Sequence, residues 1–164
     1  MKKLVLVGIV CLSLFLITGL AYAEEKLAYV NFAQLFTEYS KTKAYDTALE
    51  KKQKDFEKER EEKVNEVKKM QEKLSLLSEA ERESRKGDLE DKIAQLQEFD
   101  RSATQDLRKE RDDKAQEIFK NIQDVIKTYA QKEGITLVFD KRSLVYETKS
   151  LDITDQVLKI LNKK

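Results

Sequence analysis

Residues 41–133 form a long, proline-free stretch in which charged residues dominate and apolar residues recur every three or four positions. This spacing places the apolar side chains along one narrow stripe of an α-helix, and no proline interrupts the helical hydrogen bonds. Such a helix is stabilised mainly by packing its stripe against a second helix, as in a coiled coil. The sequence therefore predicts a solvated helical arm over this range.

The apolar stripe is interrupted between Leu77 and Leu89, where small and charged residues prevail. Within this gap, Ser78 and Glu81 have the spacing of a capping box, in which two residues satisfy each other's backbone N–H groups at the start of a helix. A second helix is therefore expected to begin in this gap.

We accordingly expect residues 43–133 to form a helical hairpin whose tip lies within residues 75–88. Residues 75–78 are the preferred position of the tip, and residues 84–87 are the second choice. One unbroken helix with an irregular stripe is the alternative.

Short apolar segments on both sides of the arm predict a β-rich body. Leu27–Phe32 and Ile135–Phe139 are rich in β-branched and aromatic residues, which favour strands. After a short turn, Ser143–Glu147 has a similar composition and predicts a β-hairpin with the preceding segment. We therefore expect residues 24–42 and 134–164 to form the body of an α+β fold.

Three residues mark expected helix ends near the body. Asn31 is suited to cap a helix after the first strand, because its side chain can accept a hydrogen bond from a free backbone N–H group. Gly134 is expected to end the long helix, since glycine adopts the left-handed conformation without strain. Asp152 is expected to cap a C-terminal helix.

Residues 1–23 predict a secretory signal peptide. Two lysines precede an apolar run over residues 4–20, and residues 21–23 (Ala-Tyr-Ala) have the small-x-small pattern of a cleavage site. We expect cleavage after Ala23 and export of the remaining chain. An uncleaved membrane anchor is the alternative.

The exported chain would contain no Cys, His, Pro or Trp, because the one cysteine, Cys11, lies in the signal segment. Disulfides and zinc sites built on Cys or His are therefore not expected. The 32 basic and 31 acidic residues nearly cancel, which gives no electrostatic case for a nucleic-acid partner. We find neither a glycine-rich phosphate loop nor EF-hand calcium spacing, so we expect no cofactor, no metal and no enzymatic activity.

The short strands also predict an oligomer. Short strands leave unpaired sheet edges, and so small a body buries little apolar surface by itself. Both problems are relieved if several chains share one body, so we expect this protein to associate with copies of itself.

The order of these motifs around a charged helical hairpin resembles the Skp/OmpH family of periplasmic chaperones for outer-membrane proteins. The residues that carry the resemblance are Leu27-Ala28-Tyr29-Val30-Asn31 with Leu35-Phe36, then Gly134-Ile135-Thr136-Leu137-Val138-Phe139-Asp140, and finally Asp152-Ile153-Thr154 with Val157-Leu158.

The resemblance implies a jellyfish-like homotrimer in the periplasm. Strands from three chains would form a small β-barrel-like body, and three hairpin arms would surround a cavity. Unfolded outer-membrane proteins, the clients of such a chaperone, would be held in this cavity without ATP and kept from aggregating. The alternative function is that of a structural periplasmic coiled-coil spacer or scaffold protein. An efflux-type adaptor would need larger β domains than this chain offers.

Two groups of apolar residues are the candidates for carrying this function. The client-binding candidates on the ascending arm, for which packing between the two arm helices is the alternative, are Phe56, Val64, Val67, Met70 and Leu74. The residues expected in the core of the body or of the oligomer are Leu27, Tyr29, Leu35, Phe36, Leu137, Phe139, Leu144, Tyr146, Ile153, Val157 and Leu161.

Basic residues near the arm tip, Lys68, Lys69, Arg85 and Lys86, are candidates for contact with a membrane surface. A solvated helix face is the alternative interpretation of these four residues.

Overall fold

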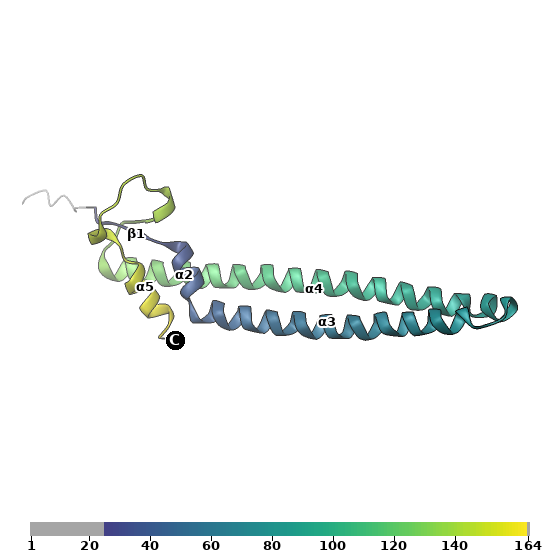
Figure 1. Cartoon of the computed structure of the whole chain (residues 1–164). Helices are drawn as coiled ribbons and strands as arrows, with labels where there is room; N and C mark the ends of the chain where they lie inside the picture. The colour runs from purple at the N-terminus through teal and green to yellow at the C-terminus, as the bar shows by residue number, and fades with distance from the viewer. Residues whose placement is uncertain (1–24, 164) are drawn as a thin grey trace, which may run out of the picture.

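The computed structural model of the chain describes residues 25–163 and consists of a small body from which a long helical hairpin projects (Figure 1). The signal peptide expected at residues 1–23 lies outside the described residues. In chain order, the elements are β1 (Leu27–Val30), α2 (Phe32–Glu38), α3 (Ser40–Ser75), α4 (Glu79–Glu133), β2 (Leu137–Asp140), the short 3₁₀ helices η1 (Lys141–Ser143) and η2 (Lys149–Leu151), and α5 (Thr154–Leu161). Across residues 25–163, no helix is both long and apolar enough to cross a membrane.

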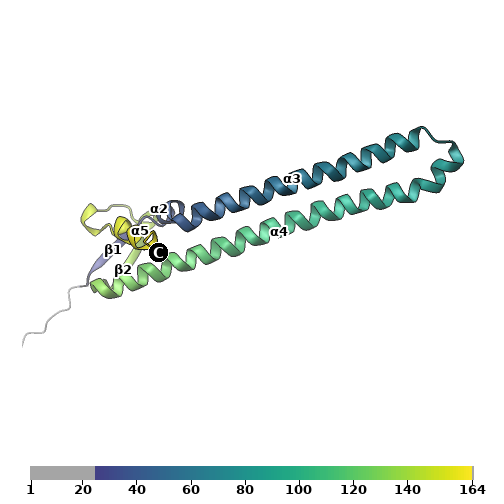
Figure 2. The same cartoon turned by 90° about the horizontal axis from the view of Figure 1, so that it is seen from below.

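The arm consists of α3 and the first part of α4, which run side by side in opposite directions (Figures 1 and 2). The two helices are joined at Leu76–Ser78, within the preferred tip position. Residues 84–87 are helical, so the second choice for the tip was wrong, and so was the alternative of one unbroken helix.

At the tip, side chains of α4 form hydrogen bonds with backbone groups that are left free at the end of α3 and in the turn. The Glu81 carboxylate accepts hydrogen bonds from the backbone N–H of Ser78 at 3.1 Å and from its hydroxyl at 2.6 Å. The Arg82 guanidinium donates to the carbonyl oxygens of Leu74 at 3.3 Å, Ser75 at 3.4 Å and Leu77 at 3.3 Å. The last carbonyl groups of a helix have no partner within the helix, so Arg82 fastens α4 to the end of α3.

Helix α4 is longer than α3 and belongs to both the arm and the body. It has 55 residues against 36 in α3, so its last turns continue beyond the arm and pass alongside the body (Figure 2). There α4 contacts α2, α5 and β2. It ends, as expected, at Gly134, which adopts the left-handed conformation with φ 67°.

The body contains a two-stranded parallel sheet. Leu27 pairs with Leu137 and Val30 with Asp140, and the whole arm forms the crossover between the two strands. Asn31 ends β1 by capping α2, since its side chain accepts from the N–H of Gln34 at 3.1 Å. Asp152, which forms an isolated bridge with Tyr29, accepts at 2.9 Å from the N–H of Thr154 in the first turn of α5.

The β-hairpin expected at Ser143–Glu147 is absent from the described chain, and this prediction was wrong. Asp140 instead begins a 3₁₀ turn, because its carboxylate accepts from the N–H of Arg142 at 3.1 Å and its carbonyl accepts from the Ser143 hydroxyl at 2.7 Å. The residues that follow are irregular up to η2. This turn directs the chain away from β2 before a hairpin can form.

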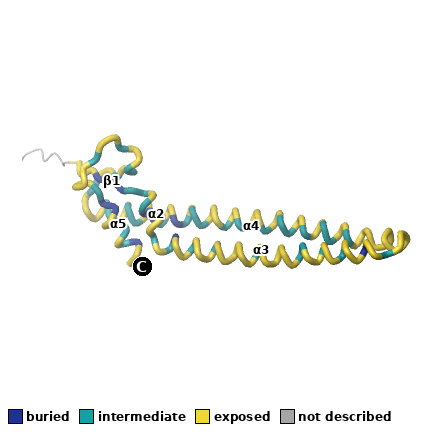
Figure 3. The backbone as a smooth tube through the Cα atoms, viewed as in Figure 1, coloured by how far each residue is buried: buried dark blue, intermediate teal, exposed yellow. Residues whose placement is uncertain are grey.

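The apolar core lies where α2 and α5 cover the body end of α4 (Figure 3). Leu35 from α2, Ile122 from α4 and Val157 from α5 are fully buried at its centre. Ile153 and Leu161 are also buried, whereas Phe36 is partly buried and packs against the same cluster. The arm in Figure 3 is mostly exposed or half-buried, so the core stabilises the body rather than the arm.

Residues expected in the core of the body or the oligomer divide into two groups in the single chain. Tyr29 is buried, and Leu144 is half-buried. Leu27, Leu137, Phe139 and Tyr146 are exposed in the single chain. Their place in an oligomer interface stays a prediction.

Candidate functional site

The five client-binding candidates all lie in the seam between α3 and α4. Four of them, Phe56, Val64, Val67 and Met70, are half-buried, and Leu74 is buried. Phe56 stacks on Phe99 of α4 with ring centroids 5.2 Å apart and an angle of 22° between the rings. In this closed arrangement, the ring of Phe56 therefore contacts another part of the chain.

Ion pairs on the flanks of the seam join the two helices. Nζ–O or N–O distances are 2.5 Å for Lys41–Glu117, 3.0 Å for Arg60–Asp100 and 3.2 Å for Lys92–Glu66, and Lys52 pairs with Glu110. All these side chains keep at least a third of their surface in solvent. Exposed pairs contribute only about 0–1 kcal/mol each, so they leave the arm helices weakly joined.

The hydrogen bond from Lys41 is the main reason why the pKa of Glu117 is lowered, and the neighbouring Lys114 adds to this effect. The same contact raises the pKa of Lys41. Lys52 likewise has a raised pKa because its ammonium donates to Glu110. Lys41, Lys52 and Glu117 therefore keep their charges at neutral pH, and these charges favour the closed arm.

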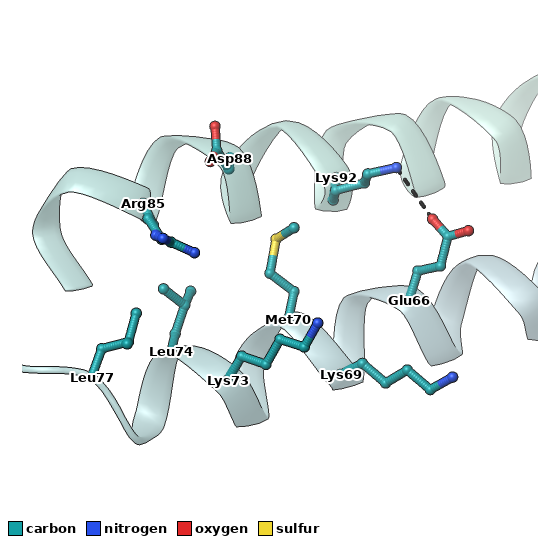
Figure 4. A pocket seen from close by; sticks show the side chains of 9 residues that line it. All are labelled: Glu66, Lys69, Met70, Lys73, Leu74, Leu77, Arg85, Asp88 and Lys92. Carbon is teal, nitrogen blue, oxygen red and sulfur yellow. Dashed lines mark hydrogen bonds and ion pairs between the residues drawn. The ribbon is translucent and has the colours of Figure 1, made fainter. Parts of the chain in front are cut away.

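A cavity of about 350 Å³ lies between the helices near the arm tip (Figure 4). Its lining residues are Glu66, Lys69, Met70, Lys73, Leu74, Leu77, Arg85, Asp88 and Lys92. In Figure 4 the Met70 side chain extends from α3 towards α4, and Arg85 extends from α4 over Leu74. Two of the five candidates, Met70 and Leu74, therefore lie together in a cavity, whereas Phe56 lies farther down the arm.

Apolar groups and unpaired cations lie together in this tip cavity. Met70, Leu74 and Leu77 supply apolar surface, and a flexible thioether such as that of Met70 adapts to ligands of different shape. Among residues 25–163, Lys69 and Arg85 form no ion pair within 4.0 Å, whereas Lys92 is paired with Glu66. The cavity can therefore offer weak, unspecific contacts to an apolar segment and an attraction to negative charge.

Leu76, which is 86% exposed at the turn of the arm, was not among the predicted functional residues. The signal was present, because Leu76 falls in the tip range and outside the periodic stripe. A leucine at the turn between two helices has no facing helix to pack against. Leu76 therefore presents an exposed apolar side chain at the end of the arm that is farthest from the body.

The described residues 25–163 hold no group of three or more His, Cys, Asp or Glu side chains that could bind a metal ion.

Residues 26–161 match the family model described as Outer membrane protein (OmpH-like). The chain therefore belongs to the OmpH-like family, as the sequence motifs indicated. Several bacterial relatives carry the name Chaperone protein Skp. The one from Pectobacterium atrosepticum is 29% identical over 141 residues, covering 84% of this chain and 86% of that protein. The one from Photorhabdus luminescens is 29% identical over 163 residues, covering 97% and 98%.

The fold also agrees with a solved structure of the same family. A crystal structure from Caulobacter crescentus, described as an outer membrane chaperone (OmpH-like), superimposes with a TM-score of 0.77 over 86% of each chain. The sequence identity is 14%, so this likeness concerns the fold. Skp/OmpH proteins are chaperones rather than enzymes, in agreement with the expectation that this chain is not an enzyme.

Proposed function

We propose that this protein is an ATP-independent holdase chaperone of the periplasm, which binds unfolded outer-membrane proteins between its arms and prevents their aggregation. Membership of the OmpH-like family and the names of the Skp relatives support this function. The signal-like residues 1–23 support export.

The observation that carries the proposal is the apolar seam of a weakly joined hairpin. A holdase that uses no ATP must bind its client at many weak points, so that release needs no energy source. Phe56, Met70 and Leu74 can offer such points when the arm helices separate locally, and charged residues around them keep the complex dissolved. Few buried contacts hold the arm closed, which favours local opening.

The exposed apolar residues of the body support assembly into a homotrimer. Leu27 is 40% exposed, Leu137 50% and Phe139 40%, and strand pairing places Leu27 directly beside Leu137. The sheet also leaves the outer edge of β2 open to a strand of another chain, whereas the outer edge of β1 is partly covered by the bridge between Tyr29 and Asp152. We infer that three bodies join through these surfaces in a barrel-like core, and that the arms then surround a cavity for the client.

The proposal can be tested by light scattering as a urea-unfolded outer-membrane β-barrel is diluted into buffer containing the mature protein and no ATP. We expect suppression of aggregation near one trimer per client. A variant in which residues 50–108 are replaced by a short linker keeps the α4 turns that carry Ile118 and Ile122 in the core. It is expected to lose this effect, because it lacks most of the seam. An unrelated helical protein at equal mass concentration controls for crowding.

Absence of suppression at a several-fold excess of the intact protein would contradict the holdase proposal and favour the structural spacer. Suppression that persists without the arms would place client binding on the body instead. The membrane-surface contact of the tip belongs to the same proposal, and co-sedimentation with anionic vesicles before and after Lys68, Lys69, Arg85 and Lys86 are changed to Gln tests it separately.

A further inference from the structure

The first turn of α3 is capped by a side chain from the far end of the sequence. Tyr39, the residue before the helix, provides no side-chain cap, and α3 has no acidic residue in its first turn. The N–H of Ser40 donates instead to the carboxamide oxygen of Asn162 at 2.8 Å. Because the first N–H groups of a helix have no partner within the helix, this contact supplies a cap that the sequence around the start of α3 lacks.

The same carboxamide also binds the end of α2. Its amide group donates to the carbonyl of Glu38, the last residue of α2, at 3.3 Å. An asparagine side chain carries both an acceptor and donors, so it can bind both sides of the break at Tyr39 at once. Thr42, whose hydroxyl would reach the Glu38 carbonyl in an unbroken helix, is buried without a hydrogen-bond partner among residues 25–163.

Asn162 is carried by a well-packed part of the body. It directly follows Leu161, which is buried, and its own N–H donates to the carbonyl of Leu158 at 3.0 Å. Val157, one turn earlier, is fully buried in the apolar core. The end of α5 lies beside the start of α3 (Figures 1 and 2). The packing of α5 therefore fixes the backbone of Asn162, and the side chain joins this fixed point to the break before the arm.

The two ends of the hairpin are joined in different ways. At the tip, the turn at Leu76–Ser78 connects α3 to α4 directly, and Arg82 adds hydrogen bonds across it. At the body, α4 continues into the core, whereas α3 begins at the break after α2. The start of α3 therefore stays beside α4 only through non-covalent contacts, and separation of the two helices can begin there.

Three kinds of contact hold the start of α3. The ion pair between Lys41 and Glu117 is largely exposed, so it contributes little. Thr42 and Tyr45 pack their side chains against the body. Among residues 25–163, the bond from Ser40 to Asn162 is the hydrogen bond that joins the backbone of α3 to α5. It is also the contact that fixes the direction of the first turn, because it acts on the backbone.

We propose that Asn162 is a positioning residue of the arm, which fastens the first turn of α3 to the body and thereby limits how often α3 separates from α4. The inference rests on the proposed chaperone function, since it names the contact that regulates access of a client to the seam. Because the tip stays joined, the part nearest the body opens first. We call residues 42–56 of α3 with residues 99–115 of α4 the lower seam.

Amide hydrogen exchange of the full mature protein, followed by mass spectrometry without client, measures this opening. Asn162→Ala removes both contacts of the carboxamide. We expect it to speed exchange in the lower seam about three- to tenfold, which is the range that follows from the loss of a helix cap. Exchange near the tip, in residues 66–92, and in the core around Ile122 and Val157 should stay unchanged. Equal exchange of the lower seam in Asn162→Ala and the unchanged protein would overturn the inference.

A second variant, Asn162→Asp, separates the two contacts. Its carboxylate can still accept from the Ser40 N–H and suits the positive end of the α3 dipole, but it cannot donate to the Glu38 carbonyl. We therefore expect exchange in the lower seam to stay within about twofold of that in the unchanged protein. Equally fast exchange in Asn162→Asp and Asn162→Ala would overturn the role of the Ser40 cap.

Lys26→Ala is the matched control, because Lys26 also lies outside the arm in sequence and also binds the backbone at a helix end. Its ammonium donates to the carbonyl of Glu133 at 2.9 Å, where α4 ends in the body. This change should speed exchange in the last turn of α4 and leave the lower seam unchanged. Faster exchange throughout α2, α5 and the core in Asn162→Ala would show that Asn162 merely stabilises the body, and would overturn the inference.

Client binding should follow the fraction of open arms. We expect the apparent Kd for a fluorescently labelled, urea-unfolded outer-membrane β-barrel, measured by anisotropy, to fall about three- to tenfold in Asn162→Ala. Faster exchange with an unchanged Kd would overturn the regulatory role.

The light-scattering assay keeps the two proposals apart. Suppression of aggregation by the unchanged protein, together with equal exchange in Asn162→Ala, would refute the role of Asn162 and leave the holdase function standing. Absence of suppression would refute the holdase function, while hydrogen exchange, which needs no client, still decides whether Asn162 restrains α3.

Discussion

Phe56 and Phe99 bring two large apolar side chains of the arm into contact, and the Lys63 ammonium lies 4.9 Å from the centroid of the Phe99 ring. Elsewhere along the seam, the contacts are made mostly by smaller side chains that remain half-buried. At the residue scale, the closed arm therefore depends strongly on this stacked pair.

Replacing Phe99 by Ala should destabilise the middle of the arm. Stacked aromatic pairs contribute about 0.5–1.5 kcal/mol beyond the burial of their area. We expect faster amide hydrogen exchange in the arm helices around this pair and unchanged exchange in the body. Leu76→Ala, at the exposed turn, is the control and should change unfolding by no more than about 0.5 kcal/mol. Equal effects of both changes would contradict the role of the stack.

Acid should weaken the base of the arm through Glu117. Lys41 and then Lys114 hold the pKa of Glu117 below its usual value of about 4.3. A carboxyl group with a lowered pKa in the folded state adds stability above its unfolded pKa, and this stability is lost as pH falls through the lower, folded value. The melting temperature of Glu117→Gln should therefore fall less between about pH 5 and pH 3 than that of the unchanged protein.

The control for this comparison is Glu90→Gln, which removes an exposed carboxylate of α4 that has no ion pair within the described chain. Between about pH 5 and pH 3, the melting temperature of this control should fall as much as that of the unchanged protein. Parallel curves for the unchanged protein and Glu117→Gln would show that the Lys41–Glu117 contact contributes nothing in solution.

At the scale of the elements, helix ends decide where the chain turns. Asn31 starts α2, Ser78 and Glu81 start the long α4, and Gly134 ends it. Only Gly134 combines a glycine with a positive φ among residues 25–163, whereas Gly87 lies within α4. The two glycines therefore have opposite roles.

Substitution of these glycines by alanine should have opposite signs. Gly134→Ala places a side chain in the left-handed conformation and should destabilise the protein by about 1–2 kcal/mol, although its added Cβ would meet no atom within 4 Å. Gly87→Ala, also without a contact within 4 Å, should stabilise the arm by about 0.5–1 kcal/mol. Urea unfolding monitored by circular dichroism measures both. A stabilising Gly134→Ala change would contradict the structure at the end of α4.

These local signals explain which elements could be predicted from the sequence. The hairpin, the caps at Asn31 and Gly134 and the turn after Ser75 follow from periodicity and from residues that act on their neighbours. The strand at Ser143–Glu147 was predicted from composition, but the Asp140 side chain forms a 3₁₀ turn directly after β2, and the residues that follow do not pair with β2. The buried, unpaired hydroxyl of Thr42 could not be predicted, because it results from the break between α2 and α3 at Tyr39.

At the scale of the whole molecule, the body of one chain buries the apolar faces of its helices but leaves part of its sheet exposed. Leu27 and Leu137 are paired in the sheet yet open to solvent, and Tyr146 projects from the irregular segment after η1. Such a surface is suited to contact with further copies of the chain.

Changing Leu137 to Asp should therefore disrupt assembly without unfolding the single chain, since the side chain is half exposed there. Sedimentation equilibrium should give the mass of a trimer for the mature protein and of a monomer for the variant. Leu76→Asp introduces the same charge at the arm tip, far from the body, and should leave the trimer intact (Figure 1). A monomeric unchanged protein at micromolar concentration would refute the trimer.

The two arm helices differ in how they are attached to the body, because α4 has no break between the tip and the core. Since α4 runs from the tip into the core without a break, it can tilt only together with the body that packs around its last turns. Helix α3 is joined to α2 through the extended residue Tyr39 and packs on the body only by its first turns, where Thr42 is buried and Tyr45 contacts the core. Opening of an arm should therefore move α3 away from α4, while α4 keeps its position relative to the body.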